Sequence, residues 1–149
     1  MRRDYFTLEA RNLDSPGVPT VAIDFEGPSD QLADRLTDEG GEPLAADEVD
    51  VACRLQGPID ESPEAVVSVT NRVTGEFILE LNADSDDVLR FIDAAREYGK
   101  ETDDQHRYRI RVAIDGNHLL EQHKGTFLVY DADGGLLRQH SLIPSGVEL

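Results

Sequence analysis

Residues 77–99 read FILELNADSDDVLRFIDAAREYG, and along this stretch the apolar side chains change from strand-like to helical spacing. Residues 77–82 have the composition of a strand. Residues 84–87 then supply a hydroxyl or carboxylate cap and further acids for the positive end of a helix. Gly99 ends the helix, whose apolar face consists of Val88, Phe91, Ile92, Ala95 and Tyr98. The stretch therefore predicts a strand that leads directly into an amphipathic helix.

Further strands are predicted on both sides of this stretch. Upstream, alternating apolar residues bounded by turn residues predict strands over 5–13, 19–26, 49–55 and 65–70. Ser29 is placed to cap a short second helix over 30–37, which Gly40 and Gly41 would end. Downstream, the same signals predict strands over 108–114, 118–123, 126–130 and 136–143.

The order of these elements, ββα-βββα-ββββ, predicts an α+β fold in a single domain over residues 1–149. Strands joined by short turns pair antiparallel. We therefore expect one mainly antiparallel sheet of about eight or nine strands, with the two helices packed on one face. Alternation along 49–55 directs Cys53 into the core.

The charge balance is strongly acidic, with 31 Asp and Glu against 14 Lys and Arg and a net charge of −17. Only Lys100 and Lys124 are lysines, so nearly all the cations are arginines, whose planar head is weakly hydrated. Such a surface is typical of proteins that work in concentrated salt, where the Debye length falls to about 3 Å at 1 M. We expect the protein to require high salt for stability and to be a poor partner for nucleic acid.

The sequence predicts a cytoplasmic protein without a membrane segment, because no leader-like or 18-residue apolar window occurs. The one cysteine excludes an intrachain disulfide. No cofactor and no metal site is predicted. His118 and His123 fall on opposite faces of their strand, and the Asp-rich turn at 131–135 lacks the later ligands of a calcium loop.

Three segments carry a resemblance to a known family. They are residues 1–6 (MRRDYF), residues 69–84 (VTNRVTGEFILELNAD) and residues 126–149, which end in HSLIPSGVEL. The chain resembles a family of small haloarchaeal proteins catalogued only as a domain of unknown function. The resemblance supports salt adaptation and implies no activity, cofactor or catalytic residue.

Arg107, Arg109 and Arg111 alternate along one predicted strand and so share one face. In one interpretation this stripe binds an anionic ligand or the acidic surface of a partner through forked hydrogen bonds. In the other, the stripe is neutralised within the sheet, where a turn at 115–117 would place Arg111 opposite Glu121.

The C-terminal residues 142–149 are unexpectedly apolar for the end of so charged a chain. Leu142, Ile143, Val147 and Leu149 either dock on their own domain, where they would cover a sheet edge, or contribute to an interface with a partner.

No established enzyme signature occurs in the sequence. Our leading hypothesis is a non-catalytic protein-interaction or structural module, whose partner is another protein or a second copy bound through the C-terminal strands. The alternative is a small enzyme whose site combines His123 or His140 with an acid and an arginine of the stripe.

Overall fold

The computed structural model describes residues 6–11, 18–26, 34–37, 40–42, 44–45, 48–102 and 107–143. Its strands are β1 (Phe6–Arg11), β2 (Thr20–Phe25), β3 (Val49–Leu55), β4 (Glu64–Asn71), β5 (Phe77–Asp84), β6 (Tyr108–Ile114), β7 (Asn117–Lys124) and β8 (Leu128–Tyr130). Its helices are α2 (Ser85–Thr102) and two 3-10 turns, η3 (Ile59–Glu61) and η4 (Arg138–His140).

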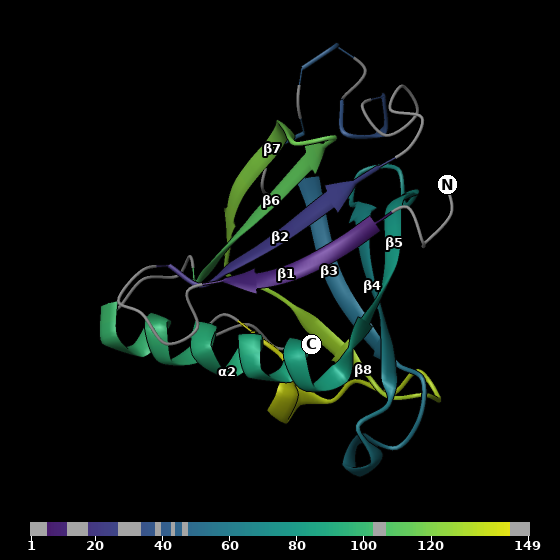
Figure 1. Ribbon diagram of the computed structural model, residues 1–149, viewed down its shortest axis with the longest axis vertical. Helices are drawn as coiled ribbons and strands as arrows, with labels where there is room; N and C mark the ends of the chain where they lie inside the picture. The colour runs from purple at the N-terminus through teal and green to yellow at the C-terminus, as the bar shows by residue number, and fades with distance from the viewer. Residues whose placement is uncertain are drawn as a thin grey trace.

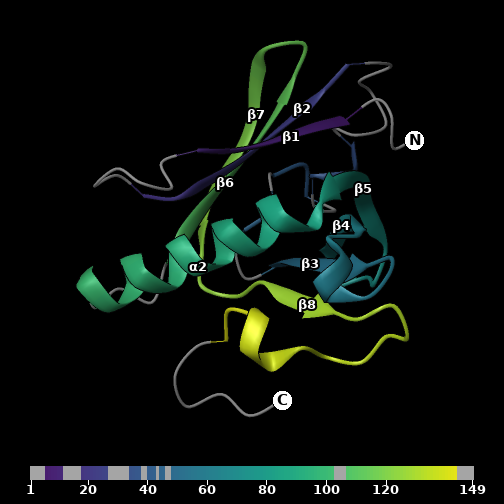
Figure 2. The same ribbon diagram turned by 60° about the horizontal axis from the view of Figure 1, so that its bottom comes forward.

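The strands form two four-stranded sheets, with the orders β1-β2-β6-β7 and β5-β4-β3-β8 (Figure 1). Both sheets are mixed, since β2 and β6 pair in parallel, as do β3 and β8, while the other neighbours pair antiparallel. The two sheets lie on either side of a shared core, which the turned view in Figure 2 shows.

Helix α2 contacts β1 and β5, which are the edge strands on one side of the two sheets. Four of the five residues of its predicted apolar face are buried, at 3% exposure or less: Val88, Phe91, Ile92 and Ala95. Phe91 meets Tyr108 of β6 edge to face, with ring centroids 5.4 Å apart. The helix therefore joins the core along the side where β1 and β5 meet (Figures 1 and 2).

The predicted architecture of one antiparallel sheet with two helices on one face is wrong. The structure has eight strands in two mixed sheets, and in the described ranges one α-helix longer than a single turn. The error has a physical reason: alternation and turns predict only the pairing of neighbouring hairpin strands. The parallel pairs join strands that are far apart in the chain, and no local signal marks them.

Two individual elements also differ from their predictions. The strand predicted over 136–143 is instead the 3-10 turn η4, flanked by single antiparallel bridges from Leu136 to Tyr130 and from Leu142 to Phe127. Residues 30–33 of the helix predicted over 30–37 lie outside the described residues. Of residues 34–37, which are described, Asp34 and Arg35 are helical. The predicted inward orientation of Cys53 is confirmed, since this side chain is 1% exposed.

Candidate functional site

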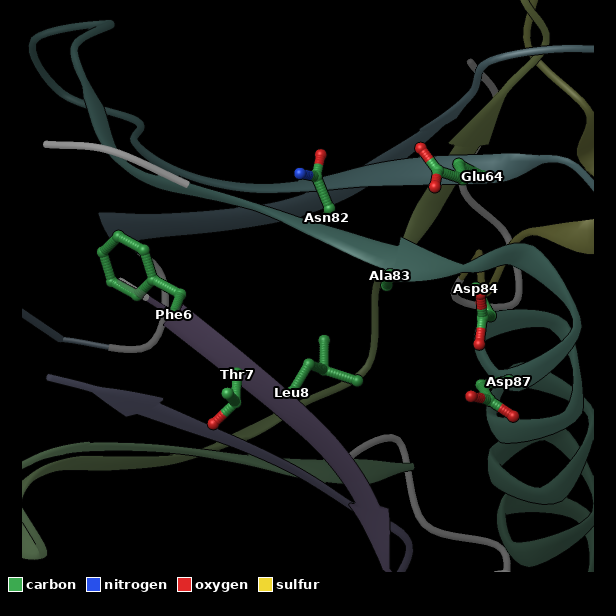
Figure 3. A pocket seen from close by; sticks show the side chains of 8 residues that line it. All are labelled: Phe6, Thr7, Leu8, Glu64, Asn82, Ala83, Asp84 and Asp87. Atoms are coloured by element: carbon green, nitrogen blue, oxygen red, sulfur yellow. The ribbon is translucent and has the colours of Figure 1, made fainter. Parts of the chain in front are cut away.

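A groove lies between β1 and β5, where the edges of the two sheets approach one another without pairing. We call this groove the seam. It encloses about 340 Å³ and is lined by Phe6, Thr7 and Leu8 of β1, Glu64 of β4, Asn82, Ala83 and Asp84 of β5, and Asp87 of α2 (Figure 3).

The direction of the backbone groups in β1 follows from the pairing of β2, which lies between β1 and β6. The carbonyls of Pro19 and Phe25 accept from the N–H groups of Arg109 and Asp115, both at 2.9 Å. Odd-numbered residues of β2 therefore face β6. Because backbone groups alternate in direction along a strand, the even-numbered residues of β2 must bond to β1.

The residues of β1 that pair with these even-numbered positions are Thr7, Glu9 and Arg11. The N–H and C=O groups of Phe6, Leu8 and Ala10 consequently point away from β2, toward the free edge. Within the described part of the chain these groups have no hydrogen-bond partner. Backbone groups left in this state bond to water or to a partner chain.

The same reasoning places free groups on β5. Gln56 N–H donates to the carbonyl of Glu64, so the even-numbered residues of β4 face β3. The odd-numbered residues of β4 then bond to odd-numbered residues of β5, and the bond from Ser85 N–H to the carbonyl of Pro63 continues this pattern. Asn82 is even-numbered, so its N–H and C=O point into the seam. The N–H of Asp84 points there as well.

The seam differs in chemistry between its two ends (Figure 3). At one end lies the ring of Phe6, which packs on Phe25 with centroids 4.7 Å apart. At the other end lie the exposed carboxylates of Asp84 and Asp87, with Glu64 directly across the ladder from Asp84. None of these three carboxylates has an ion pair or hydrogen bond within the described ranges.

The opposite end of the β5 edge is already occupied. Arg35 Nη1 donates to the carbonyl of Ile78 at 3.3 Å, which is an even-numbered position of β5. The unpaired part of this edge is therefore the part beside α2, which includes Asn82 and Asp84.

The three arginines of the stripe have different surroundings. Arg107 donates to the carbonyl of Ile143 at 3.2 Å, and its stem lies against Gly99 of α2. Arg109 pairs with Glu121 at 3.0 Å. Arg111 is the direct neighbour of Glu121 in register, as expected, but it is half-buried and has no ion pair or side-chain hydrogen bond within the described ranges.

The two histidines of the catalytic alternative lie on different elements. His123 is exposed on β7, directly across from Arg109 and two residues after Glu121, so one His/acid/Arg group does share a face. His140 lies in η4. Neither the seam nor a small void behind it, lined by Leu8, Ala10, Val21, Asp87, Val88, Phe91 and Phe127, contains a histidine.

The C-terminal apolar residues are described only in part. Leu142 is fully buried, and its backbone exchanges two hydrogen bonds with Phe127, at 2.8 and 3.0 Å. Ile143 is half-buried. Val147 and Leu149 lie outside the described residues, so their assignment to an interface stays a prediction.

Sequence reasoning did not identify the seam. Asp84 and Asp87 were explained by the start of the helix, and residues 5–13 were predicted only to form a strand. Ser85 does not supply a hydroxyl cap, because its buried Oγ has no hydrogen-bond partner in the described part of the chain.

These features define a class: a mixed, two-sheet β protein with an unpaired seam between two sheet edges. The chain belongs to the family of unknown function DUF5793, which matches residues 1–149. No curated protein and no solved structure matches it. No described helix has the length and apolar character needed to cross a membrane. In the described ranges no three His, Cys, Asp or Glu side chains are grouped as metal ligands would be.

Proposed function

We propose that this protein is an interaction module that binds an extended polypeptide segment by strand addition at the seam. The observation that carries the proposal is the pair of facing edges, on which Leu8 and Asn82 direct unpaired backbone groups into one groove. In strand addition, main-chain hydrogen bonds give affinity and pockets for alternate side chains give specificity.

The expected affinity is modest. Each backbone hydrogen bond contributes about 0.5–1.5 kcal/mol net, and a segment along the β5 edge of the seam can bond to the N–H and C=O of Asn82 and to the N–H of Asp84. Burial of its inward side chains adds about 25 cal/mol per Å² of apolar surface, while ordering of the segment opposes binding. We expect a dissociation constant of about 1–100 μM.

The proposal moves the binding surface away from the C-terminal strands. Leu142 is taken up by the core of its own chain and Ile143 accepts a bond from Arg107. The edge of β8 is covered as well, because the carbonyl of Val129 accepts from Leu137. The seam, by contrast, has backbone groups on both of its strands that lack a partner among the described residues.

The test uses one position that is exposed, lies in the seam and, although it is paired with Val66 in register, directs its backbone hydrogen-bonding groups away from β4. Asn82→Pro removes the N–H that points into the seam, and proline is tolerated where an edge N–H faces outward. Asn82→Ala is the matched control, because it removes the same side chain and keeps the N–H. A displayed library of random eight-residue peptides would be selected on the wild-type protein in 2 M KCl.

We expect selected peptides to bind the Asn82→Ala variant as the wild type and to lose about two- to tenfold in affinity for Asn82→Pro. Circular dichroism would confirm that both variants fold. Selection that enriches no peptide, or peptides that bind the proline variant equally well, would overturn the proposal.

We further propose that the module works in the salt-rich cytoplasm of a haloarchaeon. The net charge of −17 and the restriction of lysine to two positions support this setting. Thermal denaturation between 0.1 and 3 M KCl tests it: the midpoint should rise with salt, and a midpoint that is highest at 0.1 M would contradict it.

A further inference from the structure

We infer that the segment bound in the seam is basic at the end beside α2 and apolar on its inward face. This inference rests on the proposed function and names the chemistry of the ligand. It follows from the difference between the two ends of the seam and from the direction of the side chains along its two strands.

The end beside α2 is built to receive a cation. Glu64 and Asp84 are cross-strand neighbours, and Asp87 lies in the first turn of the helix that follows β5. All three line the seam, and none has an ion pair or hydrogen bond in the described part of the chain. Asp86, in the same turn, is different, because it accepts a bond from Ser62 Oγ at 3.2 Å and does not line the seam.

The positive end of α2 offsets only part of this charge. A helix N-terminus is equivalent to roughly half a positive charge, and its amides favour nearby acids. Three unpaired carboxylates remain, and a second copy of so acidic a chain would bring further negative charge to them. An arginine of a bound segment would reach them with forked, charge-assisted hydrogen bonds.

The inward face of the bound segment is apolar. Leu8 and Ala83 are half-buried in the seam, and behind them lies the small void that Val88 and Phe91 of α2 line. Side chains of an added strand alternate between the two faces, so every second residue would contact these groups. The outward residues would stand beside Thr7 and Asn82, which are exposed.

High salt sharpens this preference rather than abolishing it. At molar ionic strength, attraction beyond about 3 Å is screened, and hydrogen-bonded contact pairs persist. A basic residue at an arbitrary position in the segment would therefore not be enough for preferential binding. The residue must lie at the end of the segment that sits beside Asp84 and Asp87.

The experiment uses six-residue peptides of alternating threonine and valine, labelled with a dye for fluorescence anisotropy. One terminal residue, at either end in separate peptides, is arginine, glutamine or glutamate. Binding is measured in 0.5 M and 2 M KCl to the wild type, to Asp84→Asn/Asp87→Asn and to the control Asp86→Asn. All three substituted positions are exposed on the surface.

We expect one arginine peptide to bind the wild type at least about tenfold more tightly than its glutamate counterpart. This preference should fall to about twofold in Asp84→Asn/Asp87→Asn and persist in Asp86→Asn. A preference that survives in the double variant, or the failure of both arginine peptides to bind, overturns the inference.

A further outcome separates this inference from the proposed function. If the arginine, glutamine and glutamate peptides bind equally well, and Asn82→Pro abolishes their binding, strand addition stands and the basic preference is wrong. If the peptides bind with the expected preference but Asn82→Pro binds them as Asn82→Ala does, the acids attract basic peptides without strand addition, and the inference falls together with the function on which it rests.

Discussion

At the outer edge of β8, the N–H of Val129 donates to Ser141 Oγ and its carbonyl accepts from Leu137. At the outer edge of β1, the same groups of Leu8 have no partner in the described ranges. We call the side of the fold at β8 the closed side, and two arginines strengthen it. Arg96 of α2 donates to the carbonyls of Gln139 and Ser141, and Arg107 reaches the next alternate carbonyl, that of Ile143.

Side chains of β7 also tie the two sheets together. Lys124 is 6% exposed, and its Nζ donates to the carbonyl of Val49 in the other sheet. Gln122 donates in the same way to the carbonyl of Leu44. The difference between the two sides indicates where this fold is sealed against strand addition and where it is not.

The largest effect should separate two leucines, one on each side. Leu142→Ala leaves a cavity at a fully buried position and should lower the free energy of unfolding by about 2–5 kcal/mol. Leu8→Ala, at a half-buried position in the seam, should lower it by about 1 kcal/mol. Urea denaturation in 2 M KCl measures both, and equal losses would contradict the comparison.

The next largest effect is expected at alkaline pH, which should lower the free energy of unfolding. Burial raises the pKa of Cys53 from 9.0 to about 12, and burial also raises the pKa of Tyr108, whose hydroxyl donates to Thr126. The folded state keeps protons that the unfolded chain loses, so stability is full below about pH 9 and falls above it. Each group contributes about 1.4 kcal/mol per pH unit.

Urea denaturation at pH 7 to 11 measures this loss. Cys53→Ala should reduce the slope of stability against pH between pH 9 and 11, because it removes one of the two groups. An unchanged slope in this variant would show that Cys53 ionises in the folded state.

A smaller effect concerns the contact between Gly99 and Arg107. A Cβ at position 99 would lie 2.8 Å from Arg107 Cγ. The prediction that Gly99 ends the helix is wrong, because α2 continues to Thr102. In an Arg107→Ala background, Gly99→Ala should therefore stabilise by about 1 kcal/mol, as expected inside a helix. In the wild type that gain should be absent, because the arginine must move from Ile143. A double-mutant cycle by urea denaturation tests this coupling, and additive effects would exclude it.

The smallest effect on stability is expected at the seam. Asn82→Pro removes no ladder bond and should change the free energy of unfolding by about 0.5 kcal/mol or less. Glu9→Pro, also at an exposed position but in the β1–β2 ladder, should cost at least about 1 kcal/mol.

Amide hydrogen exchange of the wild type checks the same alternation directly. The N–H groups of Leu8 and Ala10 should exchange faster than those of Glu9 and Arg11. Uniform protection along β1 would mean that the edge is already paired.

Much of the secondary structure could be predicted from local patterns. The strand over 49–55 has the predicted bounds, and α2 buries most of its predicted face, because both patterns reflect a half-buried surface with a fixed period. The strand predicted over 136–143 is wrong because only its two ends pair, Leu136 with Tyr130 and Leu142 with Phe127. The chain between them forms the 3-10 turn η4.

The candidate site was beyond such patterns. The stripe of arginines was visible because its residues are close in sequence. A three-residue turn at 115–117 was expected to place Arg111 opposite Glu121; the structure reaches this register with Ile114 paired to Asn117 and a register shift between Val112 and Ala113. The seam unites residues 6–8 with residues 82–87, which no turn connects. Its free backbone groups depend on which strands lie at the edges of the sheets.

The sequence alone determined the acidity of the surface, most of the strands and the one long described helix, since charge and periodicity are local properties of the chain. The tertiary structure decided that the strands divide into two mixed sheets and that β1 and β5 meet without pairing. The physical reason is that a backbone donor or acceptor carries no side-chain signature. Whether such a group has a hydrogen-bond partner depends on its neighbour in space, and at the seam we propose that this neighbour is a bound polypeptide segment.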